Sequence, residues 1–116
     1  MDRIKTTAPI ATVSEANKRC HWSVRARRVK SHRRDAFYVL KQYEALRPDP
    51  PVVVTLTRIS PRGLDDDNLR SALKGTRDGV ADWLGIDDGS DQITWKYGQE
   101  RGRPKEQAVR IEIEEA

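Results

Sequence analysis

The residues of this chain best suited to chemistry are the carboxylates of Asp65, Asp66 and Asp67, which Asn68 follows directly. Three adjacent carboxylates repel one another unless a cation or several hydrogen-bond donors compensate their charge. Asp65 and Asp67 stand two residues apart just before a predicted helix, so both can converge on one point. Such an all-oxygen cluster suits Mg²⁺ or Mn²⁺. The alternative is that Asp67 caps the helix and its neighbours form a solvated turn.

A lysine and a second acidic group accompany this cluster. Lys74 follows Asp67 by almost two helical turns, which places it on the same face roughly 10 Å further along. Helical side chains lean toward the N-terminus, so its ammonium group points back toward the carboxylates. Asp87 and Asp88 follow where the helix ends, and Asp88 can approach the first cluster. This set suits metal-assisted phosphodiester hydrolysis, whereas the alternative for Lys74 is an intrahelical pair with Asp78.

The first half of the chain predicts a strand, a long helix and a central strand. The apolar residues 9–13 predict a short edge strand. Apolar residues at helical spacing predict a helix over residues 23–46, which the prolines at 48–51 must end. Residues 52–59 are rich in β-branched side chains and apolar on both faces at first, as a central strand is.

The second half begins with the helix that carries the candidate lysine. This helix is expected over residues 68–84, with Gly85 as its C-terminal cap. Gly75 and Gly79 lie four apart on one face and each weakens the helix, so they indicate a close neighbour on that side.

Alternating apolar residues then predict a hairpin with one buried face. They are Ile93, Trp95, Tyr97, Val109, Ile111 and Ile113. Together these elements predict one α+β domain over residues 1–116, with two helices on one side of a small mixed or antiparallel sheet. We expect part of residues 1–17 to be flexible.

The charges are unevenly distributed around a net charge of +4. Residues 18–34 carry eight Lys or Arg and no acid, whereas residues 65–91 carry eight Asp against three basic residues. This division suits a polyanion held by one part and a divalent cation by the other. The alternative is that the basic helix face is only solvated. The candidate DNA-binding residues are Arg25, Arg27, Arg28, Lys30, Arg33 and Arg34.

Several function classes are excluded by the sequence. Cys20 is the only cysteine, so no intramolecular disulfide forms and a reducing compartment is expected. Cys20, His21 and His32 have no zinc spacing, so His21 and Trp22 are expected in the core or facing DNA. An EF-hand fails because Arg70 and Thr76 stand where it needs Gly and Glu. Without an apolar run of about 20 residues or a signal peptide, the expectation is a cytoplasmic protein outside the membrane.

Residues 52–115 resemble the RusA family of Holliday junction resolvases, and the segment His21-Trp22-Ser23 resembles its phage and prophage members. The shared pattern is a strand, Asp-x-Asp-Asn, a helix with a lysine, a Gly-x-Asp-Asp loop and a hairpin. The resemblance implies a RusA-like fold and a homodimeric, magnesium- or manganese-dependent endonuclease that nicks four-way DNA junctions symmetrically in recombination and repair.

The resemblance also implies roles for individual residues. The metal-binding carboxylates fall on Asp65, Asp67 and Asp88, the catalytic lysine on Lys74, and supporting positions on Asn68 and Asp87. In the family pattern the lysine stands one turn earlier, where this chain has Ser71. Asp66 and Asp87 compete with Asp65 and Asp88 as ligands. The alternative function is a basic DNA-binding protein without catalysis, whose aspartates serve as helix cap and turn.

Overall fold

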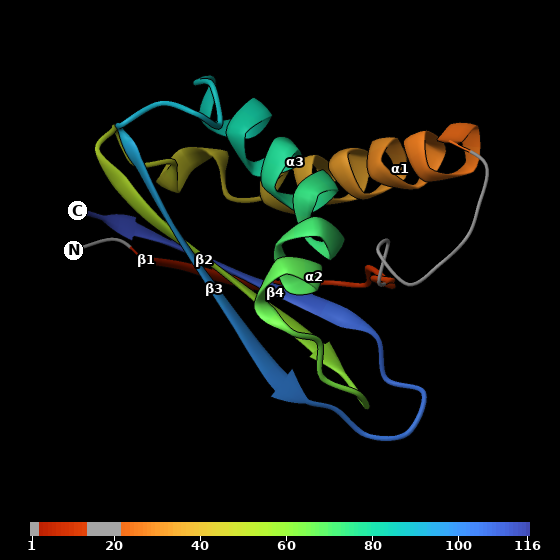
Figure 1. Ribbon diagram of the computed structural model, residues 1–116. Helices are drawn as coiled ribbons and strands as arrows, with labels where there is room; N and C mark the ends of the chain where they lie inside the picture. Colours follow the sequence, from red (N-terminus) through yellow and green to blue (C-terminus); the bar gives the residue numbers. More distant parts are fainter. Residues whose placement is uncertain (1–2, 14–21) are drawn as a thin grey trace.

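The computed structural model describes residues 3–13 and 22–116. Over these residues the chain forms a four-stranded mixed sheet with helices packed on one face (Figure 1), which confirms the predicted α+β class. In chain order the elements are β1 (Arg3–Ala8), α1 (Trp22–Lys41), a short 3-10 turn (Glu44–Leu46), β2 (Val52–Ser60), α2 (Asp66–Ala72), α3 (Lys74–Leu84), β3 (Ile93–Arg101) and β4 (Ala108–Glu115).

The sheet order is β1-β4-β2-β3, with β2 parallel to β3 and antiparallel to β4. The predicted hairpin is therefore wrong, because β2 lies between the two strands that were expected to pair. Alternation of apolar residues shows that a strand has one buried face, but not which strand is its neighbour. The crossover through α2 and α3 brings Ile93 beside Val52 at the start of β2, which allows the parallel pairing. The predicted central position of β2 is confirmed.

The N-terminal strand lies earlier than predicted. β1 spans Arg3–Ala8 and pairs with β4 at the edge of the sheet, whereas residues 9–13 form no strand. Pro9 explains the difference, because proline has no N–H group to continue the ladder.

The second predicted helix is two helices that meet at Leu73. α2 starts at Asp66, two residues before the predicted start, and α3 begins at Lys74. Leu73 has φ −97° and ψ 3°, outside the helical well, and its fully buried side chain anchors the break in the core. The cap at Gly85 is confirmed, with a φ of 75° that glycine adopts at little cost.

Helices α1 and α3 pack closely because glycines line their contact. A Cβ atom added at Gly75 would lie 2.6 Å from the Val29 carbonyl oxygen, and one at Gly79 would lie even closer to the carbonyl oxygen of Arg33. The close neighbour predicted for these glycines is therefore α1 of the same chain. Between this helix pair and the sheet lies the core, which includes Leu40, Leu56, Val80, Trp83 and Ile111.

Candidate functional site: the acidic turn and its basic surroundings

The acidic turn, residues 65–67, follows the loop after β2 and opens α2. The Asp65 side chain accepts a hydrogen bond at 3.1 Å from the backbone N–H of Asn68, so Asp65 is the helix cap that was expected at Asp67. Asp66 and Asp67 lie in the first helical turn, exposed to solvent. Within the described residues, neither of these two carboxylates forms an ion pair or a side-chain hydrogen bond. They are therefore available to a ligand.

Two side chains from the sheet fix the loop that delivers the acidic turn. Gln99 on β3 brackets Leu64: its Oε1 accepts the Leu64 N–H at 2.8 Å, and its Nε2 donates to the Leu64 carbonyl at 2.6 Å. Arg58, buried on β2, donates through Nη1 to the Arg62 carbonyl at 2.5 Å and through Nε to Thr12 Oγ1 at 2.7 Å. Burial lowers the pKa of the Arg58 guanidinium, which stays charged at neutral pH. Sequence reasoning missed both residues, because a polar residue inside a strand carries no signal for the loop it will meet.

Asp88, in the loop after α3, belongs to a separate hydrogen-bond network. Arg77 donates from Nε to Asp88 Oδ2 at 3.0 Å, from Nη2 to the Asp88 carbonyl at 2.9 Å and from Nη1 to Tyr97 Oη at 2.6 Å. Trp95 donates from Nε1 to the same Asp88 carbonyl at 2.9 Å, and its ring centroid lies 4.8 Å from the Arg77 guanidinium carbon. Burial alone would lower the pKa of Arg77, but Tyr97 and Asp88 outweigh it, and the pKa is raised. This network ties the loop after α3 to β3.

The predicted metal ligands are thus in different surroundings. Among the described residues, no group of three or more His, Cys, Asp or Glu side chains is placed to hold a metal ion together. Asp88 already shares its Oδ2 with Arg77, and its neighbour Asp87 is exposed. The acidic turn alone still fits Mg²⁺, which keeps several waters and is often held by one or two carboxylates together with substrate phosphates.

The break at Leu73 changes the position expected for Lys74. Its Nζ lies 3.3 Å from Asp78 Oδ2, one turn further along α3, so the intrahelical pair considered for Lys74 is formed in this structure. The Lys74 side chain is nevertheless 58% exposed. A fully exposed pair at this spacing contributes about 0.3–0.5 kcal/mol, but the Asp78 side chain is only 13% exposed, so a phosphate that binds Lys74 must also compensate for the carboxylate left behind.

Lys74 also lines a groove of about 330 Å³, here called the Ser71 groove. The groove lies between α2, α3 and β3, and its lining residues are Arg70, Ser71, Lys74, Arg77, Asp88 and Tyr97. The Arg70 guanidinium lies over the Tyr97 ring at 5.7 Å, and Arg25 reaches across from α1 to within 3.5 Å of Ser71 Oγ. Lys74 and Asp88, predicted to share a site, thus line one groove. Arg70 was missed, although its position one turn after Asp67 is a helical signal that could have identified it.

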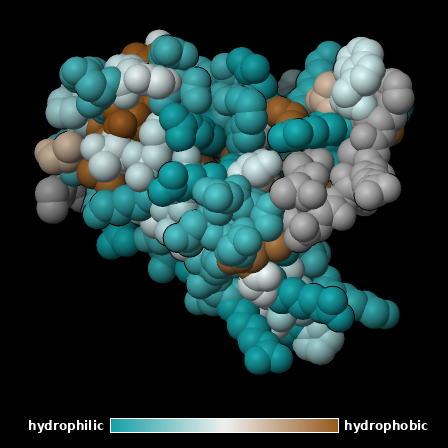
Figure 2. All heavy atoms as spheres, in the orientation of Figure 1, coloured by the Kyte–Doolittle hydropathy of each residue, from teal (hydrophilic) through white to brown (hydrophobic). Residues whose placement is uncertain are grey.

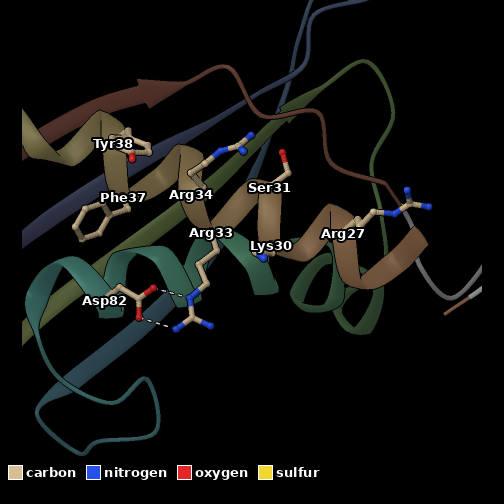
Figure 3. A pocket seen from close by; sticks show the side chains of 8 residues that line it. All are labelled: Arg27, Lys30, Ser31, Arg33, Arg34, Phe37, Tyr38 and Asp82. Atoms are coloured by element: carbon tan, nitrogen blue, oxygen red, sulfur yellow. Dashed lines mark hydrogen bonds and ion pairs between the residues drawn. The ribbon is translucent and has the colours of Figure 1, made fainter. Parts of the chain in front are cut away.

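The basic residues of α1 divide into paired and unpaired groups. Arg33 reaches α3, where its Nε and Nη2 bond to the two Asp82 oxygens at 2.5 and 2.7 Å (Figure 3). The hydrogen bonds that Arg33 donates to Asp82 raise the pKa of Arg33, and Arg33 in turn lowers the pKa of Asp82. The Nε of Arg34 lies 3.7 Å from Asp35 Oδ1, so this arginine also has a carboxylate partner. Arg33 is therefore a link between helices as well as a candidate DNA contact.

The other predicted DNA contacts on α1 lie at the surface. Arg25, Arg27 and Lys30 are exposed, and Arg28 is half-buried with contacts of its own. Arg27 and Lys30 line a groove of about 750 Å³ along the outer side of α1 (Figure 3). The face of the molecule in Figure 2 is mostly hydrophilic, with apolar residues in small separate groups.

The structure describes two of the four residues Cys20, His21, Trp22 and His32. His32 is buried, with its Nε2 at 3.1 Å from the Ala11 carbonyl oxygen, which is a structural role. Cys20 and His21 lie outside the described residues. Trp22 is 75% exposed, so of the core and DNA-facing positions considered for it, the core is wrong.

Comparisons with known proteins add no family to this picture. A scan against models of protein families found no match for this chain, and a search of curated proteins found none. Over the described residues, no helix is both long enough and apolar enough to span a membrane.

Proposed function

We propose that this chain is a metal-dependent endodeoxyribonuclease that resolves four-way DNA junctions, acting in the cytoplasm in recombination and repair. One observation carries the proposal: an exposed acidic turn with free carboxylates lies at the start of the helix that leads into the cationic Ser71 groove. Phosphodiester hydrolysis needs both parts, an oxygen-rich cation site and positive charge for the phosphate.

In this proposal the acidic turn holds the ion. Asp65 and Asp67 are its ligands, with Asp66 as the competing neighbour, and Asn68 supports the turn through the cap hydrogen bond. A bound Mg²⁺ or Mn²⁺ supplies a water of lowered pKa and neutralises charge on the phosphate. The loop contacts of Arg58 and Gln99 keep the carboxylates in place.

The cations of the Ser71 groove bind and orient the DNA backbone. Lys74 releases Asp78 and offsets the charge that builds on the phosphate, and Arg70 and Arg25 contact the neighbouring phosphates. Asp88 serves as a third ligand only if it releases Arg77; while the pair persists, Asp88 positions Arg77 at the groove.

A two-fold dimer is part of the proposal. Resolving a junction requires matching cuts on two strands related by the junction's two-fold axis, and one active site cannot occupy both positions. Two surfaces that could have formed a dimer interface, the glycine face of α3 and the apolar residues of β4, are used inside the chain, since α1 covers the glycines and Ile111 and Ile113 are fully buried. Sedimentation at micromolar concentration should give about twice the chain mass, and a monomer on junction DNA would contradict this mechanism.

The second candidate is a DNA-binding protein without catalysis. It is favoured by the ion pairs of Asp88 with Arg77 and of Lys74 with Asp78, since two of the proposed catalytic side chains are already engaged. The two candidates differ in their need for metal, because binding through phosphates needs no divalent cation.

The deciding experiment is cleavage of an end-labelled synthetic four-way junction with Mg²⁺ and with EDTA. We expect paired symmetric nicks with Mg²⁺ only, and none on a linear duplex of the same sequence. Asp67→Asn should abolish cleavage while it preserves binding, and Asp49→Asn, an exposed aspartate in the loop before β2, should cleave like the wild type. Binding without cleavage in any divalent metal would favour the second candidate.

A further inference from the structure

A second groove lies where α1 meets the start of α3 and is separate from the acidic turn. It encloses about 630 Å³ and is here called the Trp22 groove. Its apolar lining consists of Trp22, Ala26 and Val29, all on α1. Trp22 is 75% exposed, which is unusual for the largest apolar side chain. Most of the Trp22 side chain is therefore open to solvent beside the groove.

The rest of the lining is cationic. Arg25, Lys30 and Lys74 line the groove together with Arg33, and none of the described residues that line it is acidic. Arg33 is paired with Asp82 and Lys74 with Asp78, but Arg25 and Lys30 form no ion pair within the described part of the chain. A molecule that suits this groove has a flat apolar face and several negative charges.

We propose that the Trp22 groove binds an unpaired nucleotide of single-stranded DNA, whose base stacks on Trp22 while Arg25, Lys30 and Lys74 contact the flanking phosphates. The volume lies within the 300–1,000 Å³ typical of ligand sites. Stacking of unpaired bases on aromatic side chains above a cationic groove is how proteins hold single strands without sequence preference. A base inside a duplex cannot use this surface, because its faces are covered by its neighbours in the stack.

The groove adjoins the proposed cleavage site, because Lys74 lines both the Trp22 groove and the Ser71 groove. The inference extends the proposed function: the substrate would be branched DNA with an unpaired nucleotide at the branch point, held by Trp22 beside the strand to be cut. The binding step itself needs neither metal nor cleavage, so it can be tested alone.

The experiment measures binding of a 12-nucleotide oligo(dT) and of a 12-base-pair duplex in EDTA. Of the three tryptophans, Trp83 is 1% exposed and Trp95 is half-buried, so oligo(dT) should quench mainly the fluorescence of Trp22. Trp22→Leu should remove this quenching and weaken oligo(dT) binding about tenfold, with less than a twofold effect on the duplex. Trp22→Phe keeps an aromatic face and should retain most of the affinity.

The matched control is Tyr38→Leu, which removes an exposed aromatic side chain from α1 outside this groove. It should change oligo(dT) affinity by less than twofold. Equal affinity of Trp22→Leu and wild type for oligo(dT) would overturn the inference, as would equal losses for oligo(dT) and duplex. Self-association through Trp22 without oligo(dT) binding would also overturn it, and would assign the groove to a second copy of the chain.

The outcomes separate this inference from the proposed nuclease. A protein that binds oligo(dT) through Trp22 but cuts no junction in Mg²⁺ would refute the nuclease and leave the nucleotide site standing. A protein that cuts junctions but binds oligo(dT) independently of Trp22 would refute the nucleotide site alone.

Discussion

The aspartates of this chain occupy two regions with opposite surroundings. In the acidic turn, Asp66 and Asp67 are exposed and lack ion-pair partners among the described residues. On and after α3, Asp82 and Asp88 are each held by an arginine, Arg33 from α1 and Arg77 from α3 itself. The paired aspartates connect elements of the fold, whereas the unpaired ones repel each other and have only the dipole at the start of α2 to offset that repulsion unless a cation binds. Whether a carboxylate already has an arginine partner is therefore a better guide to function than the number of carboxylates in a segment.

The largest expected effect is the loss of DNA cleavage when an aspartate of the acidic turn is replaced. Asp65→Asn and Asp67→Asn each remove one charged ligand, and asparagine at position 65 retains the helix cap. Cleavage of a four-way junction should fall by at least about a hundredfold, with binding in EDTA unchanged. Labelled-junction kinetics and binding assays measure the two effects. If both variants cleaved at the wild-type rate, the acidic turn would not be the metal site.

Breaking the pair of Asp88 and Arg77 should instead lower the stability of the fold. Arg77→Met deletes the partner of Asp88 and leaves the Tyr97 hydroxyl and the Asp88 carbonyl with one donor fewer. We expect the free energy of unfolding to fall by about 2 kcal/mol, less than for a fully buried pair because the Arg77 side chain is 28% exposed. Urea denaturation gives the value. Arg103→Met, on an exposed loop, should stay within about 0.5 kcal/mol of wild type, and equal losses would count against the network.

The same division applies to the cations of α1. Arg27 and Lys30 are exposed and carry no carboxylate partner within the described residues, unlike Arg33. Replacing both with glutamine should flatten the log-log salt dependence of duplex-arm binding by up to about two units, since each phosphate contact contributes about 0.9. Titrations at several salt concentrations measure the slope. An unchanged slope would mean that these two side chains are merely solvated.

The smallest expected effect is the acid sensitivity of the Arg33–Asp82 pair. Arg33 lowers the pKa of Asp82 below its ordinary 3.8, so the unfolded chain takes up a proton before the folded one does. The pair therefore contributes fully above about pH 5 and loses its contribution as the pH falls through the lowered pKa. Both side chains are more than a third exposed, so solvent screening limits the contribution to under about 1 kcal/mol.

Urea unfolding of wild type and Asp82→Asn between pH 7 and pH 2.5 tests this effect. The difference in unfolding free energy should shrink toward zero in acid. A difference that stays constant with pH would mean that Asp82 stabilises the protein by a route other than its charge.

Much of the fold follows from local patterns in the sequence. Residues 52–59 combine β-branched content with two apolar faces, and they form the central strand β2. Gly85 follows the last apolar position of its helix and adopts the left-handed conformation expected of a cap. In β4 the apolar positions 109, 111 and 113 are buried as predicted. Each of these features depends on neighbours a few residues away, which a sequence displays directly.

What escaped prediction depends on contacts between distant residues. No local signal places β2 between β3 and β4, since both strands alternate in the same way. The break at Leu73 follows from packing in the core, and it decides which side chain Lys74 meets. Arg77 partners Asp88 only because the loop after α3 folds back along the helix. The sequence therefore identified the charged residues that could form a site, but not which of them are already held in ion pairs that support the fold.

The contact between the glycines of α3 and the carbonyl groups of α1 fixes where the cations of α1 lie relative to the acidic turn. The carbonyls of Val29 and Arg33 each lie against one glycine, so α1 cannot slide along α3 without driving a backbone atom into a larger side chain. A slip of one helical turn would displace every cation of α1 by about 5.4 Å relative to the acidic turn. That exceeds the roughly 3.4 Å between successive phosphates of a duplex strand, measured along its axis. If α1 binds DNA as proposed, two residues without side chains thus decide which phosphate each of its arginines can reach.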